Sequence, residues 1–425
     1  MSASGEHVLA TLADRGFIYQ SSDDDALHEM LRRPVTYYTG FDPTGPSLTA
    51  GHLVPIMMMA HLQRAGHRPI VLCGGGTALV GDPSGKTSSR PILTRAEIDA
   101  NLAGQRAQLL RFIELDEGKG LVVNNADWLA SLNYIEFLRD IGRHFSVNAM
   151  LSAEIYRTRL EQNLPLSFLE FNYQLLQAYD FLHLYRAYGC TLQCAGSDQW
   201  ANCLAGMDLI RRLEGAQAQV LCAPLLTTAT GAKMGKTEAG AVWLSAERTS
   251  PYDFYQYWVN VDDRDVASWL KLFTFLPLDQ IGELTSVEGA ALNAAKRTLA
   301  REVTTLVHGA QAAHEAEDAA RALFGGAGGA RDAMPSTEVA GADLDTLCAT
   351  VLDAFSHTGL CKSRSEARRL VDQGGAYVNG EQARSIEDPV GSAALRDGEI
   401  VLRAGKKRYH RLVAVGAGVT SAGAR

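Results

Sequence analysis

Apolar and polar positions along the N-terminal part of the chain form two alternating patterns. Short runs rich in β-branched, aromatic and aliphatic residues predict strands at Val35–Thr39, Pro69–Cys73, Gly120–Asn124 and Cys190–Cys194. Between them, longer stretches with a helical period predict helices at Leu53–Ala65, Arg95–Phe112, Tyr134–His144 and Gln199–Leu213. This alternation favours an α/β fold, a Rossmann-like, doubly wound parallel sheet, whose ligands bind at the carboxyl ends of the strands.

Changes of composition divide the rest of the chain. Residues 250–324 keep a helical pattern, whereas residues 325–342 are rich in glycine, alanine and proline, as in a linker. We therefore expect the α/β domain over residues 1–249, a helical domain over 250–324 and a linker over 325–342. A small α+β domain over 343–415 and a flexible tail over 416–425 complete the predicted order.

Composition indicates a globular protein. Of the 425 residues, 46% are apolar and 21% charged, which argues against intrinsic disorder. No apolar run reaches the roughly 18 residues of a membrane helix, and the first residues lack the basic segment of a secretion signal. We therefore expect a cytoplasmic protein with no membrane segment.

The cysteines favour free thiols. There are seven, an odd number in a large chain, which suits reduced thiols better than a disulfide framework. Cys190, Cys194 and Cys203 lie close together in the sequence, but their spacing matches no CxxC pair and argues against zinc. We expect no tightly bound metal.

Charge is distributed unevenly. The net charge is −8, yet from Leu344 to the end twelve Lys/Arg face nine Asp/Glu, so this part carries +3 and the preceding 343 residues carry −11. Basic residues cluster within the tail at Lys362–Arg369 and at Arg403–Arg411. The pattern indicates either a nucleic-acid-binding surface or a mildly basic solvated face.

Two separate segments have features of phosphate binding. Gly40–Gly45 lies between a predicted strand and an apolar helix, which places backbone N–H groups and a helix N-terminus beside a bound phosphate. About 180 residues later, Lys233–Thr237 offers two lysines three residues apart and a hydroxyl, after the flexible stretch Thr230–Ala232. Ammonium groups in a mobile loop suit a polyphosphate. Each segment alone could equally be an ordinary turn.

A third segment resembles a Walker A loop but does not match it. Gly81–Thr87 ends in Gly-Lys-Thr, but the GxxxxGK[ST] pattern needs glycine at position 80, where this chain has Val80. A P-loop NTPase is therefore disfavoured.

Polar side chains interrupt the apolar helix predicted around Phe168–Leu182. Tyr173, Gln177 and Asp180 are spaced i, i+4 and i+7 and lie on one face. Buried polar groups need partners, so this face lines either a cavity with a polar ligand or an internally satisfied core network.

The segments Tyr38–His52 and Lys233–Thr237 together resemble the two ATP-binding signatures of class I aminoacyl-tRNA synthetases. The residues around them resemble those of bacterial tyrosyl-tRNA synthetases, nearly continuously from Leu31 to about Phe275 and again in a shorter tail. The resemblance implies a tyrosine--tRNA ligase. Such an enzyme activates L-tyrosine with ATP to tyrosyl-adenylate, releases pyrophosphate, and transfers tyrosine to the 3′ end of tRNA(Tyr).

The resemblance also implies roles for individual residues. Tyrosine binding is implied for Tyr38, Asp82, Asn125, Tyr173, Gln177, Asp180 and Gln199, with Asp180 and Tyr38 at the phenolic hydroxyl. ATP binding is implied for Gly40, Asp42, Thr49, Gly51, His52, Gly196, Asp198 and Lys236. Candidates for stabilising charge on the leaving pyrophosphate are Lys233, Lys236, Thr237, Thr44, Lys86 and Arg90. Mg²⁺ would arrive with ATP and keep most of its waters.

The tail has its own counterpart. Ser363–Val371 and Gly375–Gly380 resemble an S4-like RNA-binding domain, a basic helix followed by a small β-structure. The resemblance implies that tRNA is bound by Arg364, Arg368, Arg369, Lys406 and Lys407. Because the family is generally dimeric, a homodimer is also implied, with the region of Phe168 at its interface.

Two departures from the family pattern keep alternatives open. The usual His-x-Gly-His begins here with Thr49, and Thr39 stands where cysteine is frequent. A degenerate synthetase that binds RNA without charging it is one alternative. A tryptophan-specific relative is a weaker one, because an indole has no hydroxyl to pair with Tyr38 and Asp180.

Overall fold

The computed structural model describes residues 8–82, 93–115, 118–229, 231, 234–237, 240–325, 334–396, 398–405 and 408–415. They form two compact units, Met1–Thr249 with Tyr257–Gly309 and Ser250–Gln256 with Ala310–Arg425. This division differs from the predicted helical domain over residues 250–324, because most helices of that stretch belong to the first unit.

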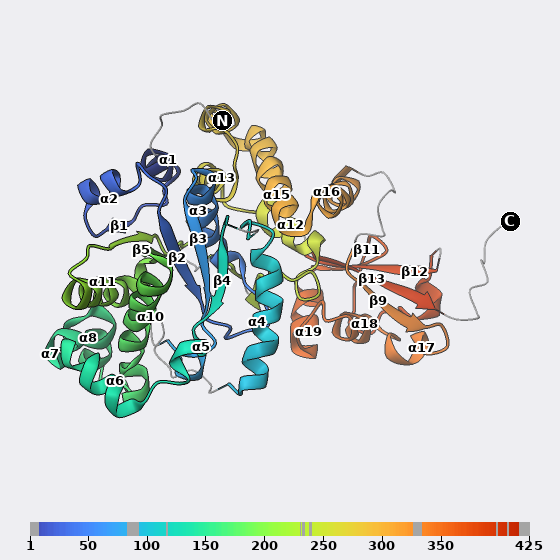
Figure 1. The fold of residues 1–425 in the computed structure, drawn as a ribbon. Helices are drawn as coiled ribbons and strands as arrows, with labels where there is room; N and C mark the ends of the chain where they lie inside the picture. Colours follow the sequence, from blue (N-terminus) through green and yellow to red (C-terminus); the bar gives the residue numbers. More distant parts are fainter. Residues whose placement is uncertain are drawn as a thin grey trace. The chain divides into compact units, whose positions relative to one another are not determined.

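A six-stranded sheet lies at the centre of the first unit, in the spatial order β1-β6-β5-β2-β3-β4 (Figure 1). Its strands are β1 (Gln20–Ser21), β2 (Thr36–Phe41), β3 (Arg68–Cys73), β4 (Leu121–Asn124), β5 (Cys190–Gly196) and β6 (Gln219–Ala223). Strands β2 to β6 are parallel, and β1 is antiparallel to β6 at one edge. The α/β fold is thus confirmed, with the four predicted strands at β2, β3, β4 and β5.

Helices cover both faces of this sheet (Figure 1). The helices of the first unit are α1 (Val8–Arg15), α2 (Asp24–Met30), α3 (Leu53–Arg64), α4 (Arg95–Leu109), α5 (Ala126–Leu129), α6 (Tyr134–Asp140), α7 (Val147–Ser152), α8 (Glu154–Glu161), α9 (Phe168–Phe171), α10 (Tyr173–Tyr188), α11 (Trp200–Glu214), α13 (Val266–Phe273), α14 (Leu278–Thr285) and α15 (Asn293–His308). Helix α12 (Pro251–Val259) crosses the boundary between the units.

Adjacent tyrosines of β2 show how the strand is held between the two helical layers. The hydroxyl of Tyr37 donates to the backbone carbonyl of Met59 in α3, at 2.5 Å. The ring of Tyr38 packs against Phe181 of α10, with 5.3 Å between ring centroids. Successive strand residues point to opposite faces, so Tyr37 fixes β2 against α3 while Tyr38 faces α10.

The second unit is built on a separate five-stranded sheet, in the order β11-β10-β12-β13-β9. Its elements are α16 (Ala310–Gly325), β9 (Ser336–Ala340), α17 (Leu344–Leu347), α18 (Val351–His357), α19 (Arg364–Asp372), β10 (Ala376–Val378), β11 (Glu381–Gln382), β12 (Glu399–Ala404) and β13 (Arg408–Val415). Phe355, Val371 and Leu412 share one hydrophobic core between these helices and this sheet.

Part of the predicted linker belongs to that sheet. Strand β9 pairs in parallel with β13, from Ser336 opposite Arg411 to Ala340 opposite Val415. The prediction of a linker is therefore wrong over Ser336–Ala340, where apolar Val339 is buried in the core. Among the described helices of the chain, none is long and apolar enough to cross a membrane.

Candidate active site

A cavity of about 590 Å³ opens at the carboxyl ends of β2, β5 and β6 in the first unit. Parallel strands place their carboxyl ends at one edge, so segments distant in the sequence meet there. The predicted residues that line the cavity are Tyr38, Gly40, Asp42, Thr44, Thr49, Gly51, His52, Asp82, Asn125, Tyr173, Gln177, Asp180, Gly196, Asp198 and Gln199. All residues predicted for tyrosine, and all those predicted for ATP except Lys236, are therefore brought together.

Asp180 of α10 is held at the buried end of the cavity. Its Oδ2 accepts from Asn125 Nδ2 at 2.8 Å, and its Oδ1 accepts from the indole Nε1 of Trp128 at 2.7 Å. The side chain is 1% exposed. Both partners are neutral donors on the segment after β4, so the carboxylate is oriented without a countercharge.

Burial dominates the ionisation of this carboxyl group. Removal from water raises the pKa of Asp180 to about 7, although the bonds from Asn125 and Trp128 lower it. The negative charge of Asp42 raises the pKa further. Asp180 therefore changes between protonated and ionised forms near neutral pH.

Tyr38 lies against the same end of the cavity with an unused polar atom. It is 1% exposed, and its hydroxyl has no hydrogen-bond partner among the described residues. Burial raises the pKa of Tyr38 well above its ordinary value, so the hydroxyl stays protonated. A buried hydroxyl without a partner is unfavourable by roughly 1–3 kcal/mol, and a ligand hydroxyl would remove that penalty.

A second network fixes Asp42 at the middle of the cavity. The hydroxyls of Thr77 and Tyr173 donate to its two carboxylate oxygens, each at 2.8 Å. Thr77 also accepts from Asn125 Nδ2 at 3.0 Å, which connects Asp42 to the partner of Asp180. A side chain at Gly74 would collide with Asp42 and Thr77, so only glycine fits there.

Amide side chains connect the other wall. Gln199 Nε2 donates to Asp82 Oδ2 at 2.8 Å. Asn202 of α11 donates to both Gln177 Oε1, at 3.1 Å, and Gln199 Oε1, at 3.2 Å. One asparagine thus sets the orientation of two amides that face the cavity.

The opposite end of the cavity is built from short loop contacts. The backbone N–H of Thr49 donates to His52 Nδ1 at 3.0 Å, and the Thr49 hydroxyl lies 2.9 Å from the same nitrogen. Because Nδ1 accepts from the backbone, the ring proton is assigned to Nε2. His52 is exposed and Thr49 half-buried.

The segment Met234–Thr237 meets the segment Tyr38–His52 at this end. Gly235 lies so close to the backbone of Gly51 that a Cβ atom at Gly235 would stand 2.8 Å from the Gly51 nitrogen. Gly235 has φ +77°, which favours glycine. Its N–H donates to the Tyr257 hydroxyl at 3.0 Å, and Val242 N–H donates to its carbonyl at 2.8 Å.

Several predicted residues cannot be placed in the cavity. Lys86, Arg90 and Lys233 lie outside the described residues, as do Lys406 and Lys407. For Lys236 and Thr237 only the backbone is described, as strand β7 (Lys236–Thr237), which pairs with β8 (Gly240–Ala241). Their predicted roles remain predictions. Arg364, Arg368 and Arg369 are exposed on α19 in the second unit.

The sequence prediction missed three residues that orient the site, namely Thr77, Trp128 and Asn202. None carries a charge, and of the three only Thr77 lines the cavity. Asn202 is 4% exposed on an otherwise apolar helix face, and a buried amide is a signal that could have indicated it.

No group of His, Cys, Asp or Glu suited to a metal ion occurs among the described residues. The seven cysteines are free and buried. Burial raises the pKa of Cys73 to about 11, so this thiol is protonated at neutral pH.

Comparison with known proteins first defines the class. Residues 30–325 match the family of tRNA synthetases class I (W and Y). A solved mitochondrial tyrosyl-tRNA synthetase of Aspergillus nidulans superposes with a TM-score of 0.69 at 29% identity, covering 76% of this chain and 95% of the other. That of Coccidioides posadasii gives 0.64 at 31% identity, covering 74% and 92%. The fold is that of a class I synthetase.

The particular family follows from the whole length. Residues 328–412 match the tyrosine--tRNA ligase SYY-like C-terminal domain. The tyrosine--tRNA ligase of Desulfatibacillum aliphaticivorans is 53% identical over 96% of this chain and 98% of its own. That of Caldanaerobacter subterraneus is 51% identical over 96% and 99%. The chain belongs to the tyrosine--tRNA ligase family.

Proposed function

We propose that the buried end of the cavity binds the phenolic hydroxyl of tyrosine between Asp180 and Tyr38. The observation that carries this proposal is a pair of buried groups with complementary needs. Asp180 is an acceptor held by two donors, and Tyr38 is a donor without a partner in the described part of the chain. A phenol donates to the first and accepts from the second. Phenylalanine would leave the Tyr38 hydroxyl without a partner and would offer Asp180 no further donor.

The remaining polar groups suit the other end of the amino acid. Tyr173, Gln177, Asp82 and Asn125 surround the amino group directly or through neighbours, and Gln199 lies near the carboxylate. Asp82 supplies negative charge for the ammonium group, and the bond from Gln199 orients it. The networks that hold Asp42 and Gln199 keep this geometry in place before the substrate arrives.

ATP occupies the exposed end in this proposal. Asp198 and Gly196 contact the ribose, while Gly40, Asp42, Thr49, Gly51 and His52 line the nucleotide site. Support comes from the close approach of Gly235 to Gly51, which brings the backbone of Met234–Thr237 to the segment Tyr38–His52. Mg²⁺ enters with ATP as part of the substrate.

The first chemical step needs no protein nucleophile or base. An oxygen of the tyrosine carboxylate forms a bond to the α-phosphorus, the bond to the bridging oxygen breaks, and pyrophosphate leaves with its electron pair. Catalysis is then positioning plus stabilisation of the leaving charge. We assign that stabilisation to Lys233, Lys236, Thr237 and Thr44, with Lys86 and Arg90 as further candidates.

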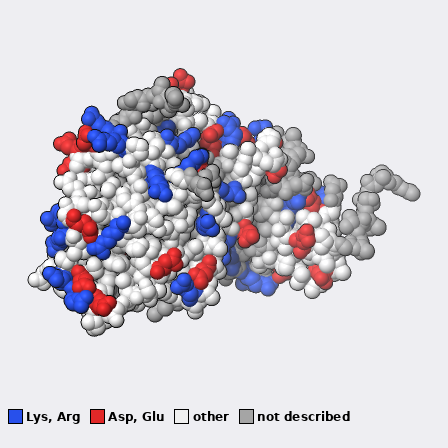
Figure 2. Space-filling model, in the orientation of Figure 1, with Lys and Arg blue, Asp and Glu red and all other residues white. Residues whose placement is uncertain are grey.

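The second step transfers tyrosine to tRNA(Tyr). A ribose hydroxyl at the 3′ end attacks the acyl carbon and loses its proton as the ester forms, and AMP leaves. We assign tRNA binding to the S4-like part of the second unit. The exposed arginines of α19 support this assignment, and Figure 2 shows Lys and Arg gathered over that helix. Arg364 is partly engaged, since it donates to Asp353 at 2.7 Å.

We also propose a cytoplasmic homodimer. Large apolar side chains are exposed along α6 to α9 of the first unit, including Ile135 at 70%, Phe168 at 69% and Val147 at 56%. Exposed apolar groups of this size favour a protein interface. Sedimentation at micromolar concentration tests it, and a monomer would contradict it.

The decisive experiment is tyrosine-dependent exchange of pyrophosphate into ATP, followed by charging of tRNA(Tyr). Exchange with tyrosine, and far weaker exchange with phenylalanine, is the expected result. Equal use of the two amino acids would overturn the assignment of Asp180 and Tyr38. Absence of exchange together with tRNA binding would favour the RNA-binding alternative.

A further inference from the structure

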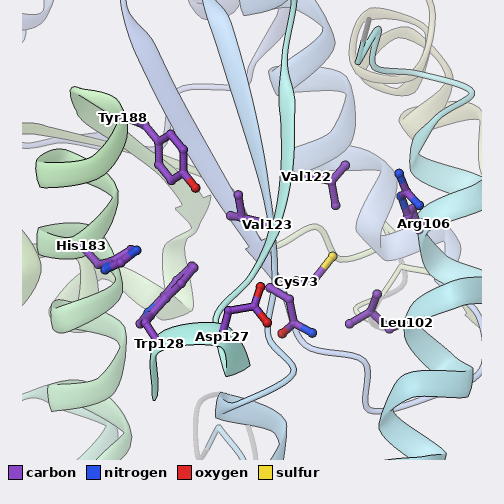
Figure 3. A pocket seen from close by; sticks show the side chains of 10 residues that line it. Cys73, Leu102, Arg106, Val122, Val123, Asp127, Trp128, His183 and Tyr188 are labelled. Carbon is purple, nitrogen blue, oxygen red and sulfur yellow. The ribbon is translucent and has the colours of Figure 1, made fainter. Parts of the chain in front are cut away.

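A crevice of about 620 Å³ lies beside β4, separate from the active-site cavity (Figure 3). Its walls come from β4, α4, α5 and α10, and its lining residues include Val123, Trp128, His183 and Tyr188. The two hollows share no lining residue. They are nevertheless connected through one side chain, because the indole of Trp128 lines the crevice while its N–H holds Asp180.

Trp128 is supported from the crevice side by His183. The imidazole and indole rings are stacked, with 4.1 Å between centroids and 15° between planes. In Figure 3 the two rings lie face to face, one from α10 and one from α5. Asp180 and His183 are three residues apart on α10, so they lie on one face of the helix. The indole of Trp128 therefore contacts α10 twice: its N–H donates to Asp180, and its ring face stacks on His183.

This contact matters because an indole N–H is directional. A hydrogen bond weakens steeply as its angle departs from linearity, so a small rotation of the Trp128 ring would weaken its bond to Asp180. One side of the indole faces the crevice and so lacks close packing there. Helix α5 is only four residues long and adds little rigidity of its own. Trp128 also belongs to a hydrophobic core cluster and is 9% exposed, and the stacked imidazole of His183 adds a ring-to-ring contact that opposes the rotation.

We propose that His183 is a positioning residue for tyrosine recognition, acting by stacking on Trp128 so that the indole N–H stays directed at Asp180. The inference rests on the proposed role of Asp180. Burial lowers the pKa of His183 below its ordinary value, and the charge of Arg186 lowers it further. A neutral imidazole ring is consistent with a stacked aromatic pair.

The effect should fall on the KM for tyrosine and leave kcat for pyrophosphate exchange unchanged. The phenol lies at the end of the substrate remote from the reacting carboxylate, so its binding is used equally in the ground and transition states. We expect His183→Ala to raise the KM about 2- to 10-fold, the range of an aromatic pair. His183→Phe restores the stacked ring and should restore the KM. His183→Leu, which fills the space without a planar ring, should behave as His183→Ala and replaces it if that variant folds poorly.

A double-mutant cycle with Trp128→Phe tests the route of the effect. That variant keeps a ring but removes the N–H, so His183→Ala in its background should cause no further rise in KM. A full effect of His183→Ala in that background would overturn the proposal. So would an unchanged KM in the single variant, or an equal rise in Tyr188→Ala, the matched control from the same crevice.

Asp180→Asn separates this proposal from the assignment beneath it. If Asp180→Asn leaves the KM for tyrosine unchanged, the proposed phenol site is wrong and the role of His183 falls with it. If Asp180→Asn and Trp128→Phe both raise the KM and His183→Ala does not, the role of His183 alone is wrong.

Discussion

The two ends of the active-site cavity are built in different ways. At the end proposed to bind the phenol, here the phenol end, Asp180 is 1% exposed and its oxygens are held by neutral donors from the segment after β4. At the end proposed to bind the phosphates, here the phosphate end, His52 is exposed and its Nδ1 contacts Thr49, three residues away. Specificity depends on buried polar groups, because water cannot replace the hydrogen bond that is lost when a substrate lacks the right partner. An exposed end can replace a lost contact with solvent, so it should tolerate a substitution such as Thr49 for histidine.

The largest expected effect is at the phenol end. Phenylalanine should be discriminated by about 10⁴–10⁵, a magnitude known for this enzyme family and adopted from it. In Asp180→Asn only one side-chain oxygen remains as an acceptor. Asn125, Trp128 and the substrate hydroxyl each donate to the carboxylate in the proposed complex, so at least one of these bonds is lost. A hydrogen bond to a charged group is worth about 1.5–3 kcal/mol, so tyrosine activation should weaken about 10- to 150-fold.

Steady-state exchange with both amino acids measures this loss. Asp127→Asn is a matched control, because Asp127 is exposed on the same short helix as Trp128 and lines the crevice outside the cavity. If Asp127→Asn loses as much tyrosine activation, or if Asp180→Asn still discriminates against phenylalanine, Asp180 does not recognise the phenolic hydroxyl.

A variant outside the active-site cavity tests tRNA binding separately. Replacing both Arg368 and Arg369 with Gln should remove two phosphate contacts and reduce the salt slope of log Kd by roughly 1.4–1.8. When salt rises from 50 to 200 mM, the unmodified protein should therefore lose about tenfold more tRNA affinity than the double variant loses. The measurement is filter binding at several salt concentrations, with pyrophosphate exchange unchanged.

Arg364→Gln is the matched control, since its pairing with Asp353 leaves less of its charge available. A larger slope change in Arg364→Gln than in the double variant would contradict the assignment. An unchanged slope in both would place the RNA-binding surface elsewhere.

The pH dependence of tyrosine binding sharpens the contrast between the two ends. Because the pKa of Asp180 is raised to about 7 and the ionised form accepts the phenol, affinity should rise with pH up to and through 7. About a tenfold weaker Kd is expected at pH 6 than well above pH 7. Equilibrium dialysis measures it, and Asp180→Asn should give a flat profile over the same range. An equally steep profile in that variant would assign the titration to another group.

Folding stability should change in the opposite direction. The folded pKa of Asp180 is above its ordinary value of 3.8, so its contribution to stability is fully present below about pH 4. This contribution is lost as pH rises through about 7. The group therefore destabilises the free protein at the pH at which we propose that it binds tyrosine best.

Patterns within the sequence predicted the parallel sheet, because short apolar runs are local, whereas most site residues were indicated by the resemblance to the synthetase family. The patterns did not predict β1, since a two-residue strand has too little pattern, and they also missed β6. Strand β9 was also missed, because its residues lie in a stretch of small residues that resembles a linker. Thr77, Trp128 and Asn202 act through other side chains, so only the three-dimensional contacts reveal them.

The smallest expected effect concerns Thr49 at the phosphate end. Its hydroxyl lies against His52 Nδ1, a nitrogen that already accepts from the Thr49 backbone. Thr49→Ala therefore leaves the backbone bond and the ring tautomer in place, and it loses one neutral hydrogen bond, worth about 0.5–1.5 kcal/mol. We expect adenylate formation to slow about 2- to 13-fold, with tyrosine binding unchanged. Thr49→Ser keeps the hydroxyl and is the matched control.

Thr49→His should raise the rate if the local backbone accepts the larger ring, because it adds a donor near the phosphates while His52 remains. Pre-steady-state measurement of adenylate formation compares the four proteins. A loss far above this range in Thr49→Ala would mean that the phosphate end is as strictly organised as the phenol end. Equal rates in all four would mean that position 49 contributes nothing to the reaction.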